Sequence, residues 1–469
     1  MNKGFVKNII NLMISNLISL MISVLSSFIT PLILGHDGYG YYKIFSLYTT
    51  YVPLLHIGFI DGILIRNAGK NLEDISFKKF RTYTLFLLVF ELFLSIVMSI
   101  FACLINIPQI NREIIIAIAI YSFLLNALTY FQFFSKCIMR FSELASIARL
   151  QSFINLFFLL LALYLYKFTA FNVNVTYYMF YMNFAVFILL CYYVIRYKKI
   201  ILGKRRTMAS QFKNIRVFFR VGFAIMISYQ ITMVMVNADN QFISMFFKVS
   251  EYGKYAFAYS LAALLLTVFN AVSSVMLPYM KKAGKSAVES NHDSNMAIMN
   301  TIVFLVIMSY YPIAWIVNNF ISSYSESVRY LSIVFPGVGI TCIVQSYIFN
   351  DYIMAKKIKD FCYISLANLV LDFATYYVGF RLTHSTLKIA LLSIPLLMIW
   401  YLTLEWFMNA ESGVKFIKNF YYLMIMAFAF IIISHIRNII MSMILYVVVY
   451  VAITLAFYFK TFKTIILNL

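Results

Sequence analysis

Charged residues are scarce in this 469-residue chain, and acidic residues are the scarcest of them. Asp and Glu together number 17 against 38 Lys and Arg, and charged residues make up only 12% of the chain. An ordinary soluble domain carries about 25% charged residues. A chain that is 63% hydrophobic is therefore not a soluble globule. Its net charge of +21 has no soluble domain to carry it, so we expect no nucleic-acid partner.

Cysteine is also sparse, and sequence motifs of common enzymes are missing. The five cysteines fall in apolar runs without paired or metal-ligand spacing, so we interpret them as small buried hydrophobes. The chain contains no G-x-x-x-x-G-K-[ST], no H-E-x-x-H and no G-x-S-x-G sequence. Familiar routes to ATP hydrolysis, zinc hydrolysis and serine hydrolysis are thereby excluded. We predict no enzyme, no cofactor and no metal.

Long apolar segments occupy most of the chain instead. Runs of about 20 apolar residues have the length of a transmembrane helix, and lipid admits only helices or closed barrels. We predict an all-α polytopic membrane protein with 14 transmembrane helices, and we keep 12 as the alternative. The predicted spans are 9–34, 42–65, 82–105, 114–136, 147–166, 174–195, 217–247, 255–280, 295–317, 330–355, 361–380, 387–408, 420–436 and 439–459.

The basic residues alternate along the chain and predict its topology. The stretches between predicted spans, together with the two chain ends, form a series of gaps. Every second gap is basic, and these gaps together hold 29 of the 38 Lys and Arg residues. Cytoplasmic loops carry such an excess, so both termini are predicted to face the cytoplasm. The widest basic gap, Arg196 to Arg216, is then a cytoplasmic linker. The outward gaps are all short, which leaves no room there for a catalytic domain.

The beginning of the chain resembles its middle at a shift of 213 residues. Each segment runs from a basic entry through a span to a predicted Tyr-Gly turn, at Tyr39-Gly40 and Tyr252-Gly253, and then through a second span to an Ala-Gly-Lys exit. Repeats that start on the same side are parallel, which predicts two six-helix lobes around a central cavity. The predicted parts are an N-terminal lobe at 1–205, a C-terminal lobe at 206–410 and an additional C-terminal helix pair at 411–469.

Polar residues follow one face of the first span and one face of the seventh. Spacings of three or four place such residues together on a helix. Helix packing through small residues and a water-filled cavity both explain a single stripe, and its recurrence in two equivalent helices favours the cavity. The residues are Asn8, Asn11, Ser15, Ser19, Ser23, Ser26 and Thr30 in the first span, and Gln230, Asn237, Gln241 and Ser244, with Asp239 and Asn240 beside them, in the seventh.

Six acidic residues fall inside predicted spans, where a charge costs about 2.5–3.5 kcal/mol at mid-membrane. We expect Asp61, Asp351 and Glu405, which lie near span ends, to pair at the interface with cations such as Arg66 and Lys356. The other three are candidates for function. The whole set of candidate substrate or ion residues is Asp239, Asn240, Gln241, Asn237, Asp372, Asn368, Glu91, Lys43 and Lys254.

Within this set the residue types suggest roles. Asp372 shares a helical face with Asn368, which favours a cavity-facing position. Lys43 and Lys254 stand at the outer starts of the second and eighth spans, beside the repeated Tyr-Gly pair. Snorkelling to the interface explains either lysine, and a pair of cations at a cavity mouth could also hold phosphate.

Two segments carry a resemblance to a known family. They are PLILGHDGYGYY at 31–42 and HIGFIDGILIR at 56–66. The chain resembles the polysaccharide-export branch of the multidrug/oligosaccharidyl-lipid/polysaccharide (MOP) exporter superfamily, and O-antigen flippases most of all. In that family a Pro-bearing first span, a Gly-Tyr-Gly turn and a Gly-rich second span ending in Ile-Arg recur.

The resemblance implies a mechanism and a setting. Two six-helix bundles would alternate in access and flip an undecaprenyl-pyrophosphate-linked oligosaccharide across the bacterial cytoplasmic (inner) membrane, for O-antigen and lipopolysaccharide biosynthesis. The partners would be the lipid-linked oligosaccharide, the lipid bilayer, a polysaccharide polymerase and a chain-length regulator. Asp239 or Asp372 could couple transport to H⁺ or Na⁺, because no nucleotide site is present.

Three alternatives stay open. Fourteen spans are typical of lipid II flippases in the same superfamily, although the arginine cluster of that branch is not found here. A multidrug or cation antiporter has the same fold, but its cavity is usually more apolar than these polar stripes. A membrane glycosyltransferase such as an O-antigen polymerase belongs to another class and usually has a large outward loop, which this chain lacks.

The topology is tested by labelling a Lys204→Cys variant in which the five native cysteines are replaced by alanine. A membrane-impermeant maleimide should react with it in inside-out vesicles and not in intact cells, because the linker is predicted to be cytoplasmic. Labelling in intact cells would invert the topology.

Overall fold

The computed structural model describes residues 3–69, 72–269, 290–409 and 416–467, together with 273, 276 and 280. Thirteen helices in this part of the chain are long and apolar enough to cross a membrane. The prediction of an all-α polytopic membrane protein is confirmed. One difference from the predicted spans concerns the first helix, Leu17–His56, whose 40 residues are about twice the length that one crossing needs.

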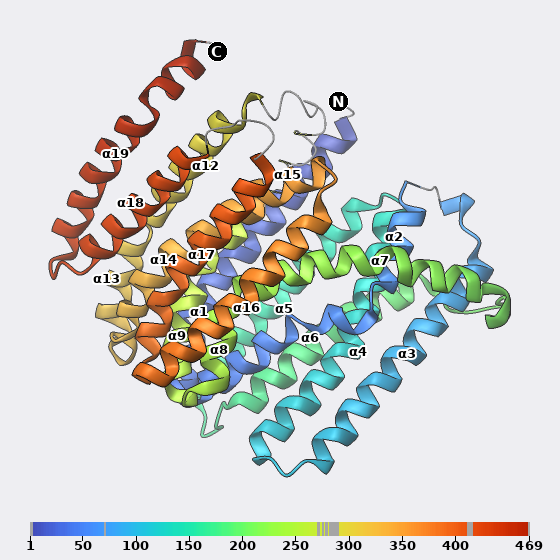
Figure 1. Cartoon of the computed structure of the whole chain (residues 1–469). Helices are drawn as coiled ribbons and strands as arrows, with labels where there is room; N and C mark the ends of the chain where they lie inside the picture. The colour runs from blue at the N-terminus through green and yellow to red at the C-terminus, as the bar shows by residue number, and fades with distance from the viewer. Residues whose placement is uncertain are drawn as a thin grey trace. The chain divides into compact units, whose positions relative to one another are not determined.

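The helices follow one another along the chain, with short 3₁₀ and π segments (η) between some of them (Figure 1). They are α1 (Lys3–Thr49), η1 (Val52–His56), α2 (Phe59–Asn67), η2 (Leu72–Asp74), α3 (Phe77–Leu104), α4 (Gln109–Cys137), α5 (Phe141–Phe168), α6 (Val175–Arg196), η3 (Lys198–Ile200), α7 (Met208–Val236), α8 (Ala238–Phe246), α9 (Val249–Ala262), α12 (His292–Ile307), α13 (Tyr310–Phe320), η4 (Ser322–Tyr324), α14 (Ser327–Ile343), η5 (Val344–Ile348), α15 (Phe349–Met354), α16 (Ile358–Thr383), α17 (Thr386–Asn409), α18 (Ile417–Ser434) and α19 (Ile439–Leu467).

A kink at Gly35 explains why the first helix is so long. Gly35 has φ 63° and ψ −176°, which is not a helical conformation, and glycine adopts positive φ at little cost. The halves on either side of Gly35 correspond to the first and second predicted spans, so the structure agrees with 14 crossings when they are counted separately. The turns expected at Tyr39-Gly40 and Tyr252-Gly253 are wrong, because these residues lie inside α1 and α9.

Several predicted spans are divided rather than continuous. The second, 42–65, passes from the end of α1 through η1 into α2. The seventh, 217–247, is divided into α7 and α8 at Asn237, whose φ of −106° and ψ of 13° interrupt the helix. The ninth, 295–317, is divided between α12 and α13, and the tenth, 330–355, among α14, η5 and α15. An apolar run reports the length of a segment and not local backbone breaks, so these interruptions could not be read from hydropathy.

The chain divides into two compact units, Met1–Gln230 and Ile231–Leu469. The division falls inside α7, so most of that helix belongs to the first unit. The lobes expected at 1–205 and 206–410, and the separate pair at 411–469, stay predictions.

In the first unit, α1 packs on α5, and α4 packs on both α3 and α6. Aromatic side chains fill much of its core. Phe59 of α2 contacts Phe218 of α7 at 5.9 Å between ring centroids, and Tyr83 of α3 contacts the same ring at 5.1 Å. Phe134 of α4 lies 5.2 Å from Phe80. The amino-terminal part of α7 is thereby an integral part of this unit.

Glycines let α2 and α7 approach each other backbone to backbone. A Cβ atom built on Gly222 of α7 would lie 1.8 Å from the carbonyl oxygen of Gly58, and one on Gly62 would lie 2.0 Å from that of Phe218. Gly58 and Gly62 are four residues apart, the small-residue spacing that favours close helix contact in membranes. No side chain fits between these two backbones.

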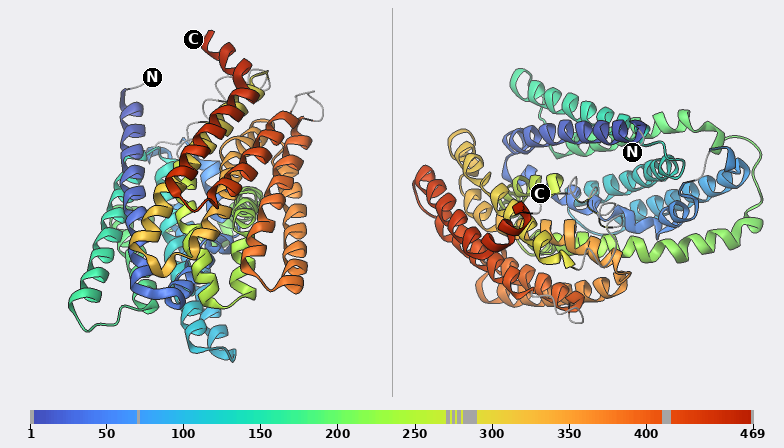
Figure 2. Two further views of the ribbon diagram at one scale, coloured as in Figure 1. Left: turned by 90° about the vertical axis from the view of Figure 1, so that its left-hand side faces the viewer. Right: turned by 90° about the horizontal axis from the view of Figure 1, so that it is seen from above.

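In the second unit, α14 is the central helix. In the most apolar stretch of the segment Ser327–Met354, 94% of the residues are buried. The α14 helix packs against α9, α12, α17 and α18. The α18 and α19 helices lie side by side (Figure 2). They are joined to α12 by polar contacts: the Tyr446 hydroxyl donates to the Phe304 carbonyl at 2.8 Å, and Asn300 Nδ2 donates to the Tyr458 hydroxyl at 2.9 Å.

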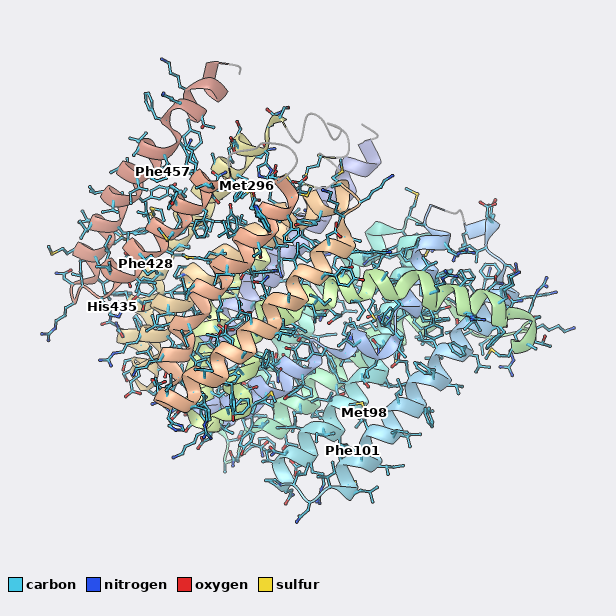
Figure 3. The ribbon with its side chains drawn as sticks, in the orientation of Figure 1. Met98, Phe101, Met296, Phe428, His435 and Phe457 are labelled. Atoms are coloured by element: carbon cyan, nitrogen blue, oxygen red, sulfur yellow. The ribbon has the colours of Figure 1, made fainter. Side chains whose placement is uncertain are left out.

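Large apolar side chains cover the outer faces of the helices, as expected for helices that meet lipid. Phe101 on α3 is 59% exposed and Phe428 on α18 is 53% exposed, and Figure 3 labels both. Some predicted features lie outside the described residues: Lys70, Lys281, Lys282, Lys285 and Lys415, and with them the Ala-Gly-Lys sequences of the repeat.

A Gly222→Val variant should lose stability, because its side chain would push α7 away from α2. Overpacking typically costs about 1–3 kcal/mol, measurable as a lower melting temperature of the protein in detergent. The control is Gly337→Ala in α14, whose Cβ would meet only the flexible tip of Leu397 at 3.3 Å. Equal melting temperatures for the valine variant and the native chain would refute the tight contact.

Candidate functional site

Asp239 lies in the first turn of α8, immediately after the break at Asn237. Its side chain is 7% exposed. Oδ1 accepts a hydrogen bond from the backbone N–H of Asn240 at 2.6 Å, and Oδ2 accepts one from the hydroxyl of Tyr255 on α9 at 2.6 Å. Ser393 of α17 faces the same carboxylate. The break in the helix therefore gives a buried acid a set of donors from three helices.

Asp372 of α16 lies close enough to Asp239 for their carboxylates to interact electrostatically. Its side chain is 1% exposed, and its Oδ1 atom has no hydrogen-bond partner among the described residues. Two like charges so close and so deeply buried are costly. We call Asp239 and Asp372 the acid pair; loss of one of the two negative charges would relieve the repulsion between them.

Aromatic rings surround the acid pair. Tyr376, one turn after Asp372, interacts with both carboxylates and lies 5.6 Å from the ring of Phe242 on α8. Tyr255 is fully buried and donates directly to Asp239. Both carboxylates are buried among these rings, and burial strengthens any electrostatic interaction between them.

The amide residues of the candidate set lie near the pair but have different partners. Asn368, one turn before Asp372, donates to the hydroxyl of Thr403 on α17 at 3.1 Å. Asn237 donates to the carbonyl of Met233 at 2.8 Å. Asn240 and Gln241 are buried in α8, and Asn240 Oδ1 has no partner among the described residues. The structure thus gathers six of the nine predicted residues on α8, its N-cap and α16 of the second unit.

Glu91 lies apart from this group, in α3 of the first unit. It is fully buried, and its Oε2 atom accepts a hydrogen bond from Asn126 Nδ2 of α4 at 2.9 Å. Asn126 also donates to the Val52 carbonyl of η1 at 3.3 Å. Glu91 Oε1 and Asn126 Oδ1 have no hydrogen-bond partner in the described chain. Glu91 therefore links three segments of the first unit and keeps unused bonding capacity.

The two lysines of the candidate set have different surroundings. Lys43 Nζ lies over the rings of Tyr39 and Tyr42, 5.3 and 5.6 Å from their centroids, which is a cation–π arrangement. Lys254 Nζ forms an ion pair with Glu326. A phosphate would have to displace this carboxylate to reach Lys254, whereas the face of Lys43 away from its rings needs no such exchange.

The polar stripe of the first span is in part a helix-packing seam. Ser15 donates to the Ala145 carbonyl of α5 at 3.2 Å, and the hydroxyls of Ser19 and Ser152 are 2.6 Å apart. Ser26 bonds to Thr30 within α1. For Ser15 and Ser19 the packing interpretation is therefore the correct one, and the side chains of Asn8 and Asn11 lie outside the described part.

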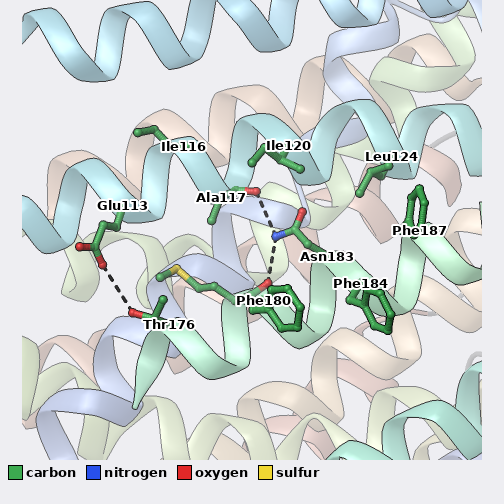
Figure 4. A pocket seen from close by; sticks show the side chains of 11 residues that line it. Glu113, Ile116, Ala117, Ile120, Leu124, Thr176, Phe180, Asn183, Phe184 and Phe187 are labelled. Carbon is green, nitrogen blue, oxygen red and sulfur yellow. Dashed lines mark hydrogen bonds between the residues drawn. The ribbon is translucent and has the colours of Figure 1, made fainter. Parts of the chain in front are cut away.

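An apolar groove of about 610 Å³ lies between α4 and α6 in the first unit. In Figure 4, Phe180, Phe184 and Phe187 of α6 form one wall, and the facing wall belongs to α4. Its polar groups are few: Glu113 contacts the Thr176 hydroxyl at 3.5 Å, and Asn183 bonds to backbone carbonyls. Such a lining suits a hydrocarbon chain and offers a sugar almost no hydrogen bonds.

Sequence reasoning missed several residues that the fold brings together. Tyr255 and Ser393 carried no signal of their own, because each lies in an apolar run. Asp351 and Glu405 do not pair with interfacial cations as expected. Both lie beside His292, which no sequence pattern had selected. No group of three or more His, Cys, Asp or Glu side chains in the described chain could hold a metal ion.

Comparison with solved structures identifies the fold. The chain is similar to a "Lipid II flippase MurJ, inward closed conformation", with a TM-score of 0.65 at 15% identity, covering 97% of this chain and 99% of that one. It is also similar to a "MATE in complex with MaL6", with a TM-score of 0.57 at 12% identity, covering 87% and 97%. It is similar as well to a MOP superfamily transporter from Pyrococcus furiosus, with a TM-score of 0.54 at 10% identity, covering 87% of this chain and 97% of that one. The fold is therefore that of the MOP exporter superfamily.

The family follows from the sequence itself. The family model for "Polysaccharide biosynthesis protein" matches residues 5–283, more than half of the chain, and the chain belongs to that family. A search of curated proteins found no match. The resemblance stated from residues 31–42 and 56–66 is thereby confirmed at the level of the polysaccharide family.

A Tyr255→Phe variant should destabilise the second unit, because Asp239 Oδ2 would lose its donor inside a water-free site. A buried acceptor left unsatisfied costs about 1–3 kcal/mol, visible as a lower melting temperature. The control is Tyr401→Phe in α17, equally buried, whose hydroxyl has no hydrogen-bond partner among the described residues. Equal losses in the two variants would contradict the bond to Asp239.

Proposed function

We propose that this chain is a flippase that moves a lipid-linked oligosaccharide, with an undecaprenyl-pyrophosphate carrier, across the bacterial cytoplasmic membrane by alternating access. The family match to polysaccharide biosynthesis proteins supports the polysaccharide part of this proposal. The fold, similar to that of a lipid II flippase, supports transport of a lipid-borne substrate. Both termini are proposed to be cytoplasmic, and a polymerase and a chain-length regulator are the proposed partners.

The observation that carries the proposal is the acid pair Asp239 and Asp372. A membrane protein retains such a costly arrangement where it serves an ion or a substrate. We assign the pair to coupling with H⁺ or Na⁺, since one proton or one monovalent cation would relieve the repulsion between the carboxylates. Uptake and release of that ion would favour different arrangements of α8 and α16, which gives transport a source of free energy.

The polar residues near the pair are proposed to contact the sugar. Asn237, Asn240, Gln241 and Asn368 offer amide donors and acceptors, the groups that match sugar hydroxyls. Lys43 in the first unit is proposed to hold the pyrophosphate, and Lys254 is proposed as a separate phosphate contact of the second unit after its release from Glu326. The lipid chain would remain in hydrocarbon, where apolar surfaces such as the groove between α4 and α6 meet it. Glu91 is proposed as a second acidic group of the transport cycle.

The test is complementation of a strain that lacks its flippase for lipid-linked oligosaccharide. The full chain should restore surface polysaccharide, and Asp239→Ala or Asp372→Asn should reduce it to background while the lipid-linked intermediate accumulates, because the variant cannot take up its ion. The matched control is Asp360→Asn, on the same helix as Asp372 but exposed. Membrane levels of every variant are measured by immunoblot.

Normal polysaccharide in both acid-pair variants would remove the pair from the mechanism. Rescue of a strain deficient in lipid II flipping, without rescue of the oligosaccharide flippase strain, would replace the proposed substrate by lipid II.

A further inference from the structure

A second buried cluster of ionisable side chains lies in the second unit, around His292, the first residue of α12. Its Nε2 atom is 3.0 Å from Oε2 of Glu405 on α17, and its Nδ1 atom is 3.7 Å from Oδ2 of Asp351 on α15. The exposed fractions of the three residues are 2%, 1% and 7%. Each nitrogen of this buried imidazole faces a carboxylate. Gain or loss of a proton on the ring therefore changes which of its neighbours it can bond.

The contact on the Nε2 side does not depend on the charge of the ring. Glu405 Oε2 also accepts a hydrogen bond from Asn409 Nδ2 at 3.0 Å, one turn further along α17. A carboxylate held in this way can only accept, so Nε2 carries its hydrogen in both the neutral and the charged form of the ring. The proton that comes and goes is therefore the one on Nδ1.

The Nδ1 atom has two neighbours, one that can donate a hydrogen bond to it and one that can only accept a hydrogen bond from it. The hydroxyl of Tyr347 lies 3.4 Å away, somewhat closer than the Asp351 carboxylate. A bare Nδ1 can accept a hydrogen bond from the hydroxyl, whereas a protonated Nδ1 can donate to the carboxylate. Asn295 Nδ2 approaches the Tyr347 oxygen at 3.5 Å as a donor, which leaves the hydroxyl's own proton free for Nδ1.

A local irregularity of the backbone sets up this choice. Residues Val344–Ile348 form a π-helical turn between α14 and α15, and Tyr347 and Asp351 are four residues apart across its end. Side chains at that spacing lie on one face of a helix, so both reach the same nitrogen. Single π turns are rare and occur frequently at functional sites.

We propose that His292, Tyr347, Asp351 and Glu405 form a proton-binding site that sets the contact between α12 and α15. With the proton bound, Nδ1–H donates to Asp351 and ties α12 to α15. With the proton lost, Nδ1 accepts from Tyr347, and Asp351 loses its partner on α12. The bond to Glu405 persists in both states, so α12 stays attached to α17 while its contact with α15 is made or released.

The effect can extend to the acid pair through the chain itself. α15 leads directly into α16, and Tyr352 packs on Phe361 at 5.4 Å between ring centroids. Asp372 lies further along the same helix. The proposed site is nevertheless distinct from the acid pair, because it uses α12, η5 and α15, and it does not depend on the identity of the transported molecule.

Other ionisable groups surround the cluster and must be considered in any pH experiment. Asp293 and Glu405 interact electrostatically with the buried hydroxyls of Tyr347 and Tyr401. The groups contributed by the packed elements are Asp293 of α12, Tyr347 of η5, Asp351 and Tyr352 of α15, Tyr401 and Glu405 of α17 and Tyr458 of α19, whose ring has Lys418 of α18 over it.

The test compares two conservative variants of the full chain in detergent at about pH 6 and about pH 11, because the two facing carboxylates favour the charged ring to well above the ordinary histidine range. Asp351→Asn should lower the melting temperature by about 2–4 °C at the acidic pH and leave it nearly unchanged at the alkaline pH. Tyr347→Phe should do the reverse, because it removes the donor to the neutral ring. His435→Gln, at an exposed position, is the control and should change neither.

Equal losses at both pH values in the two variants, or no loss in either, would overturn the proposal, since a purely structural cluster predicts no dependence on pH of this kind. If either variant fails to insert, the native chain gives the answer. Hydrogen–deuterium exchange at the imidazole C2 position of His292, followed by mass spectrometry across the same pH range, should show a titration step. A constant rate would show that the ring never changes its charge, and the proposal would fall.

Discussion

The cost of placing charge in hydrocarbon shapes this protein more than any other constraint. Charges are few, and most basic residues lie in the gaps between apolar segments. Three of the acids that remain inside accept hydrogen bonds: Asp239 from Tyr255 and a backbone N–H, Glu91 from Asn126, and Glu405 from His292 and Asn409. An unneutralised carboxylate at these depths would destabilise the fold, so each acid reports a place where a proton, an ion or a polar partner belongs.

Breaks in the helices supply the partners that continuous helices could not. The interruption at Asn237 frees the first turn of α8, where the N–H of Asn240 binds Asp239. The π turn at Val344–Ile348 brings Tyr347 and Asp351 to one imidazole. Backbone irregularity inside a membrane is tolerated where the freed groups are satisfied by protein. Both clusters of acids in the second unit depend on such an interruption.

The sequence predicted the fold class, the spans and the superfamily, because these depend on local composition and on short motifs such as those at 31–42 and 56–66. It also selected Asp239, Asp372 and Asn368, since a polar residue in an apolar run is visible without a structure. It did not predict that Asp351 and Glu405 share His292, because that meeting joins residues more than fifty positions apart. The packing of Ser15 and Ser19 on α5 was undetermined for the same reason.

What the sequence determined by itself is how the chain divides between lipid and water. The free energy of transferring each segment from water to lipid depends on the apolar surface of that segment, and these free energies add along the chain. Only the tertiary structure decided which acids face each other, which glycines let α2 meet α7, and which nitrogen of His292 has a choice of partner. These depend on distances of a few ångströms between helices, and such distances follow from packing the whole unit and not from any single segment.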